Sequence, residues 1–162
     1  MKRFAFYILA LVVLAFDGLT KSWALSTLAG GRNLSVIPGY VSLSVVYNRG
    51  SAFGIVRQGS AALAVIALIA IGFMVYIERR GLPDRLARAA IALQLGGALG
   101  NFADRARFGY VIDFIELDWR GKNIWPVFNI ADSAITVGTI LLIWWLWRSQ
   151  AAEAREAAKT AR

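Results

Sequence analysis

The chain has neither histidine nor cysteine among its 162 residues, and only ten of its residues are acidic. These absences remove the ligands usual for zinc, the cysteine nucleophile and the histidine base. They also leave no cysteine that could be lipidated, so the chain is not itself a lipoprotein. If the protein is an enzyme, we expect no metal or other cofactor, and carboxylates are the leading candidates for moving protons.

Long hydrophobic runs dominate what is present. Hydrophobic residues make up 58% of the chain, charged residues only 17%, and the mean hydropathy is +0.56. Four runs, at 4–25, 61–77, 87–103 and 130–147, approach the ~20 residues that span a bilayer core. We therefore expect an all-α membrane protein in which residues 1–162 form one polytopic domain with four transmembrane helices.

The first run resembles a secretory signal in having Lys2 and Arg3 before an apolar stretch. It continues through Asp17 and Lys21, however, and no A-x-A cleavage site directly follows the apolar stretch. We therefore predict a retained transmembrane helix.

Basic residues predict the orientation of the chain. The net charge of +8 could suggest nucleic acid, but in a membrane protein it first reports which loops are cytoplasmic. Ten of the eighteen basic residues fall at the two termini and the loop between runs two and three: Lys2, Arg3, Arg79, Arg80, Arg85, Arg88, Arg148, Arg155, Lys159 and Arg162. We predict that both termini are cytoplasmic, although the other side is also basic and the bias is modest.

Two regions then lie outside the membrane, at about 26–60 and 104–129. Residues 35–47 alternate and contain a Pro38-Gly39 turn, which predicts a small sheet or hairpin. Residues 104–129 carry Trp119, Trp125 and Pro126, which is typical of an interfacial loop. The tail 148–162 is interpreted as a cytoplasmic extension of the last helix. In the third run, small residues at Ala92, Gly96, Gly97 and Gly100 predict close helix packing.

The acidic residues divide by position. Glu78, Asp84, Glu153 and Glu156 are expected to be cytoplasmic and solvated, and the loop 78–85 to be a simple polar turn. Glu116 and Asp118 are expected to be surface groups near Arg120 and Lys122.

Two of the remaining aspartates have local partners. Asp17 and Lys21 stand four residues apart on one helix face and can form an ion pair. Asp104 is followed by Arg105, and we expect these two to pair and to serve as a scaffold.

Asp113 and Asp132 remain as the candidate catalytic residues. Asp113 lies in an apolar run without a local partner. Asp132 begins the last helix, so a capping or first-turn role explains it about equally well. If the two carboxylates meet, they can share a proton and activate water for peptide hydrolysis. Ionisable groups at membrane depth are costly and usually functional. Serine with Lys21 as base is a weaker alternative.

The sequence resembles the lipoprotein signal peptidases (signal peptidase II), which are aspartyl peptidases of bacterial membranes. The resemblance rests on four blocks: DGLTKSWA (17–24), VYNRGSAFG (46–54), GGALGNFADRARFGYVIDFI (96–115) and FNIADSAITVG (128–138). It departs from the family pattern at Gly18, where glutamine is usual, and at Ser51, where alanine or glycine is common.

The resemblance implies that Asp113 and Asp132 are the catalytic dyad. It also implies supporting roles for the matching polar residues Asp17, Lys21, Asn48, Asn101, Asp104, Arg105 and Asn129. The implied substrates are diacylglyceryl-modified prolipoproteins, cleaved just before the lipidated cysteine. The implied setting is the bacterial inner membrane, with the site at the outer face in contact with membrane lipid. Globomycin-type inhibitors are expected to bind, and no nucleic acid partner is expected.

Two other classes of function fit the same acids. A small proton-coupled transporter or channel would predict solute flux without hydrolysis. A non-enzymatic scaffold would predict that changing the two aspartates lowers stability rather than activity.

Overall fold

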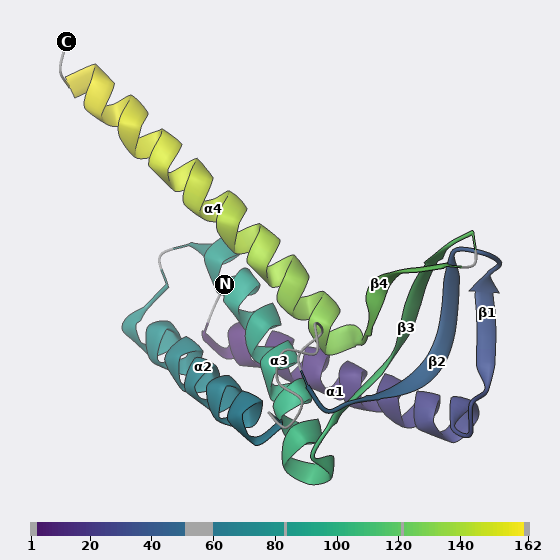
Figure 1. Ribbon diagram of the computed structural model, residues 1–162. Helices are drawn as coiled ribbons and strands as arrows, with labels where there is room; N and C mark the ends of the chain where they lie inside the picture. The colour runs from purple at the N-terminus through teal and green to yellow at the C-terminus, as the bar shows by residue number, and fades with distance from the viewer. Residues whose placement is uncertain (1–2, 51–59, 83, 121, 161–162) are drawn as a thin grey trace.

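The computed structural model describes residues 3–50, 60–82, 84–120 and 122–160. Within them the chain forms four helices and one four-stranded sheet, which extends from one end of the helical part (Figure 1). In chain order the elements are α1 (Arg3–Leu28), β1 (Asn33–Ile37), β2 (Val41–Asn48), α2 (Ser60–Arg80), α3 (Arg85–Phe108), β3 (Val111–Trp119), β4 (Lys122–Phe128) and α4 (Ile130–Thr160). The tail is thus continuous with α4, as predicted.

Three helices in the described part of the chain are long and apolar enough to cross a membrane: Arg3–Leu28, Ser60–Arg80 and Ile130–Glu153. The fourth predicted span, 87–103, is helical and lies within α3. As a whole, α3 is less apolar than the other three helices, and it contacts α1, α2 and α4. Its inner residues are buried against protein, so its polar side chains find partners there.

Glycines bring the backbones of these helices together. A Cβ atom on Gly96 would lie 2.6 Å from the carbonyl oxygen of Ala10 in α1. A Cβ on Gly97 would collide with the carbonyl oxygen of Ala131 in α4. The predicted close packing of small residues is confirmed, and α3 is the helix on which α1 and α4 rest.

The end of the bundle away from the sheet differs from its prediction. Glu78 is fully buried rather than solvated, and its Oε2 lies 3.2 Å from Nε of Arg88. Asp84 caps α3 by accepting from the Leu86 N–H, and its other oxygen pairs with Arg148 of α4 at 3.1 Å. The polar turn therefore joins α2, α3 and α4, because its charges face neighbouring helices.

The sheet has the order β1-β2-β3-β4 with every neighbouring pair antiparallel. The predicted hairpin is confirmed as β1 and β2, joined by a turn in which Gly39 has φ +78°. The predicted interfacial loop at 104–129 is wrong, because most of it forms β3 and β4. Residues Val111–Phe114 are all buried, so β3 does not begin with an alternating pattern. Pro126 is tolerated in β4 because β4 is an edge strand of the sheet.

Strands β3 and β4 bring the segments that carry Asp113 and Asp132 together. β3 follows α3 after Gly109, which has φ +76° and closes the helix. Phe114 on β3 packs with Ala24 and Leu28, which fixes the sheet to the end of α1. Since β4 leads directly into α4, the start of β3 and the start of α4 meet beside α1 and α3.

Candidate active site

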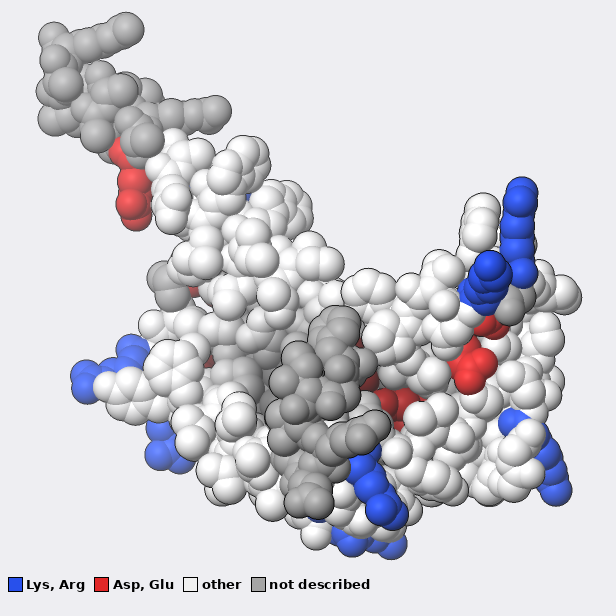
Figure 2. Space-filling model, viewed as in Figure 1, with Lys and Arg blue, Asp and Glu red and all other residues white. Residues whose placement is uncertain are grey.

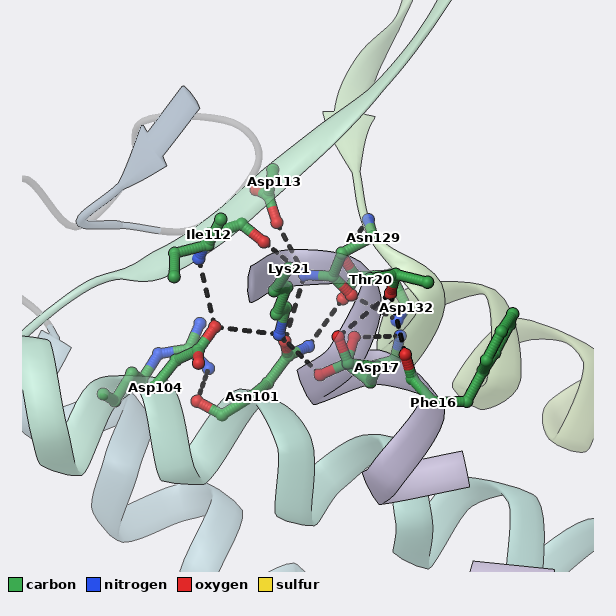
Figure 3. Close-up of polar contacts among 12 residues, drawn as sticks. Phe16, Asp17, Thr20, Lys21, Asn101, Asp104, Ile112, Asp113, Asn129 and Asp132 are labelled. Carbon is green, nitrogen blue, oxygen red and sulfur yellow. Dashed lines mark hydrogen bonds and ion pairs between the residues drawn. The ribbon is translucent and has the colours of Figure 1, made fainter. Parts of the chain in front are cut away.

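A buried ion-pair cluster forms the base of the site (Figure 3). Lys21 Nζ lies 2.7 Å from Asp17 Oδ2 and 2.8 Å from Asp104 Oδ2. The predicted Asp17–Lys21 pair is confirmed. The predicted Asp104–Arg105 pair is wrong: Arg105 donates instead to the Asn101 carbonyl oxygen at 3.3 Å. Consecutive helical residues do not face each other, so Asp104 meets the lysine of another helix.

The first turn of α4 carries Asp132 in a capping box. The Asp132 N–H donates to Asn129 Oδ1 at 2.9 Å, and the Asn129 N–H donates to Asp132 Oδ2 at 3.2 Å. Asp17 Oδ1 accepts from the Ala131 N–H at 2.9 Å. The first-turn position predicted for Asp132 is confirmed, while Asn129 is the cap itself.

Asp113 stands on β3 with only 1% of its surface exposed. Its two oxygens accept from Asn48 Nδ2 at 2.8 Å and from Asn129 Nδ2 at 2.7 Å. Burial raises the pKa of Asp113 to about 6; the Asn48 and Asn129 hydrogen bonds oppose this rise, and the nearby Asp132 charge adds to it. A carboxyl group with such a pKa is suited to exchange protons near neutral pH.

Asn101 connects the ion-pair cluster to Asp132. Its Nδ2 donates to Asp132 Oδ1 at 2.7 Å, and its Oδ1 accepts from Lys21 Nζ at 3.1 Å. Asn129 Nδ2 also approaches Asn101 Oδ1 at 3.1 Å. All of the polar residues selected from the sequence therefore belong to one connected network, with Arg105 at its edge through the Asn101 carbonyl.

Asp113 and Asp132 line one cavity of about 390 Å³. Its wall also includes Asn48 and Arg105, and β4 supplies the stretch from Trp125 to Phe128. In the space-filling view, acidic side chains gather along the sheet and in the recess beside it, whereas Lys and Arg lie at the outer edges (Figure 2). Within the described part of the chain, no three acidic side chains converge as they would around a metal ion.

A second, mostly apolar groove of about 560 Å³ adjoins this cavity between α2, α3 and α4. The two share Leu63 and Arg105 as lining residues. An apolar segment lying in the groove could therefore reach the two carboxylates without leaving the protein surface.

Some contributions were not found from the sequence. The Ala131 N–H is a backbone donor, and the β4 residues that line the cavity form no recognisable motif, so neither can be predicted from the sequence. The sequence predicts that Trp125 and Pro126 lie at a membrane interface; in the structure they also line the cavity. Glu116, expected near basic residues, accepts instead from Ser42 at 3.0 Å and from Ser44. Ser51 lies outside the described residues.

Comparison with known proteins agrees with this geometry. Residues 9–148 match the family model described as "Signal peptidase (SPase) II". A "Lipoprotein signal peptidase" of Moorella thermoacetica is 41% identical over 152 residues, covering 93% of this chain and 98% of that protein. One of Pseudomonas fluorescens is 39% identical over 153 residues, covering 91% of this chain and 90% of that protein.

Solved structures show the same fold. A structure titled "Bacterial membrane enzyme structure by the in meso method at 2.3 A resolution" aligns with a TM-score of 0.82 and 33% identity, over 90% of this chain and 89% of that one. A second, with a similar title at 1.9 Å, has a TM-score of 0.79 and 34% identity, over 88% and 92% of the two chains. The chain belongs to the signal peptidase II family and is a multi-pass bacterial membrane peptidase.

Proposed function

We propose that the chain removes signal peptides from diacylglyceryl-modified prolipoproteins by cleaving the peptide bond just before the lipidated cysteine. The name shared by its curated relatives supports the substrate class. The observation that carries the chemistry is that Asp113 and Asp132 line one cavity and are bridged by Asn129.

In this proposal the two carboxylates activate one water molecule. The ionised Asp132 takes a proton from the water as its oxygen attacks the scissile carbonyl carbon. The protonated Asp113 donates its proton to the carbonyl oxygen, which gives a tetrahedral diol. Collapse of the diol breaks the C–N bond: the proton held by Asp132 passes to the leaving amine, and one hydroxyl proton of the diol returns to Asp113. Water is consumed, and the free signal peptide and the new cysteine amine are the products.

The other polar residues hold this pair and the substrate in place. Asn48, Asn101 and Asn129 donate to the carboxylates, while Asp17, Lys21 and Asp104 fix the helices that carry them. Arg105 lines both the cavity and the groove, where its guanidinium is suited to bind a substrate carbonyl. The apolar groove is suited to an acyl chain or an apolar signal segment.

The distribution of charge supports an orientation for the site. The start of α1 and the far part of α4 lie on the side away from the sheet (Figure 1). Described basic residues flank that side, which we assign to the cytoplasm: Arg3, Arg79, Arg80, Arg85, Arg88 and Arg148. The sheet and the carboxylates are then at the outer face of the inner membrane, where a signal peptide is cut. We propose that one copy of the chain is sufficient for activity.

The test is cleavage of a purified diacylglyceryl-prolipoprotein, followed by gel shift, in the presence and absence of a globomycin-type inhibitor. Asp113→Asn and Asp132→Asn should each lower the rate at least about 100-fold, since each removes one proton-transfer group. Asp118→Asn on the same strand as Asp113 is the matched control and should retain activity. Full cleavage by either dyad variant would exclude the mechanism. Loss of folded protein in both, without activity loss per folded molecule, would instead favour a scaffold.

A further inference from the structure

Three asparagine side chains surround the two carboxylates, and all three present the same end. In each case the amide Nδ2 donates to Asp113 or Asp132 at 2.7–2.8 Å. A primary amide has a donor end and an acceptor end of nearly equal size. Rotated end for end, Asn101 would place its oxygen against an oxygen of the ionised Asp132, which repels it. The end that each amide presents depends on its other contacts.

The structure shows what fixes them. Each amide oxygen accepts from a group that can only donate. Gly50 N–H donates to Asn48 Oδ1 at 3.1 Å, and Asp132 N–H donates to Asn129 Oδ1 at 2.9 Å. These two donors are backbone groups, and they remain whatever side chains the sequence carries.

Asn101 is different, because its orienting donor is a side chain. The Lys21 ammonium group has three protons and no acceptor, and it lies within 3.1 Å of three acceptors: Asp17, Asp104 and Asn101 Oδ1 (Figure 3). Asn129 Nδ2 also approaches Asn101 Oδ1, but its two hydrogens are shared among Asn101, Ile112 and Asp113. Lys21 is thus the stronger and more exclusive donor to this oxygen.

We propose that Lys21 is a positioning residue for the reaction, and that its ammonium group fixes which end of the Asn101 amide faces Asp132. The inference rests on the proposed function. By holding Asn101 Oδ1, Lys21 leaves only the Nδ2 end to meet Asp132. Asp132 then receives an N–H bond that stabilises its ionised form, which the proposed reaction requires in a base.

A purely structural role for Lys21 makes a different prediction. Its ion pairs also join α1 to α3, so losing it could simply lower the amount of folded enzyme. That loss would reduce the rate by the same factor at every pH. A misoriented Asn101 would instead remove the hydrogen bond that stabilises the ionised form of Asp132. The acid limb of the pH–rate profile would then move to higher pH.

The experiment measures kcat/KM against pH, per folded molecule, for cleavage of a diacylglyceryl-prolipoprotein. Lys21→Met should move the acid limb up by about one pH unit, since a hydrogen bond to a charged group is lost. Asn101→Leu, which removes the amide, should move it by a similar amount. Combining the two should give no further movement if Lys21 acts through Asn101. Lys122→Met, an exposed lysine on β4, is the charge-matched control and should leave the profile in place.

An acid limb that does not move in Lys21→Met overturns the inference. Additive shifts in the double variant also overturn it, because Lys21 would then act on Asp132 by another route. If Lys21→Met does not fold, Lys21→Gln replaces it: glutamine remains polar beside Asp17 and Asp104 but can both donate and accept. It should shift the limb in the same direction, whereas Lys21→Arg, again a pure donor, should restore it. Failure of the proposed function would appear separately, as an unmodified chain that does not cleave the substrate or does not need Asp113 and Asp132.

Discussion

Asn129 and Asp132 each accept a hydrogen bond from the other's backbone N–H, at 2.9 and 3.2 Å. The same asparagine side chain donates to Asp113 at 2.7 Å. Asn129 therefore both caps α4 and bridges the two candidate catalytic carboxylates. The contacts that begin the helix are also contacts of the site.

These two roles can be separated by substitution. Asn129→Ser keeps an oxygen that can cap α4 but loses the amide that reaches Asp113. We expect the serine variant to be about 10–100-fold less active, since the acid is no longer held. Asn129→Ala should be about 1 kcal/mol less stable than the serine variant, because the cap is also lost. Thermal unfolding in detergent and single-turnover cleavage measure the two effects; equal stability of the two variants would contradict the capping role.

The raised pKa of Asp113 predicts a pH-dependent stability effect. The folded state holds this group protonated up to about pH 6, whereas the unfolded chain releases the proton near 3.8. Ionising Asp113 therefore costs the folded state stability as pH rises between these values, and the cost is complete above about pH 6. Asp113→Asn removes this cost. Its stability relative to the unmodified chain should rise by about 2 kcal/mol from pH 4 to pH 7.5. A constant difference, measured by chemical unfolding at both pH values, would show that burial does not disfavour the charge.

The contact of α3 with α4 predicts a contrast between two glycines. A Cβ at Gly97 meets the Ala131 backbone oxygen, which cannot move without shifting the first turn of α4. Gly97→Ala should cost about 1–3 kcal/mol of stability and reduce cleavage. A Cβ built on Gly72 in α2 would meet nothing within 4 Å, so Gly72→Ala should be neutral or stabilise the helix by up to about 1 kcal/mol. Unfolding midpoints of both variants decide the matter, and equal effects would contradict the packing argument.

Gly18 marks the departure from the family pattern, and its surroundings predict a mild effect. Nothing lies within 4 Å of a Cβ built there, and the residue is exposed on α1. Gly18→Gln should therefore fit, retain cleavage activity and stabilise α1 by about 0.5–1 kcal/mol. Cleavage rate and unfolding midpoint are the measurements; a loss of activity would mean that a side chain here obstructs the substrate.

Local patterns predicted much of this molecule. The four apolar runs all became helices, the Pro38-Gly39 turn joined two strands, and the spacing of Asp17 and Lys21 placed them in contact. Each of these depends on residues close together in the sequence. The motifs of the resemblance also selected a set of polar residues that the structure joins into one network.

The failures involve packing between different secondary-structure elements. Asp104 pairs with Lys21 rather than with its neighbour Arg105, and Glu78 is buried against Arg88. β3 was not predicted because its first four residues are all buried, so the strand begins without an alternation of buried and exposed residues. Such outcomes depend on how the helices and the sheet pack, and no local spacing contains that information.

The strand register sets where this sequence tolerates insertions and deletions. Ile115 pairs with Phe128 on β4, and Val46 of β2 pairs with Asp113. A single residue gained or lost along β3 would turn Asp113 to the opposite face of the sheet, away from Asn48 and Asn129. Length changes at the turn between Trp119 and Lys122 leave that face unchanged. Viable relatives should therefore vary in length at the turn and keep the number of residues from Asp104 to Asp113 fixed.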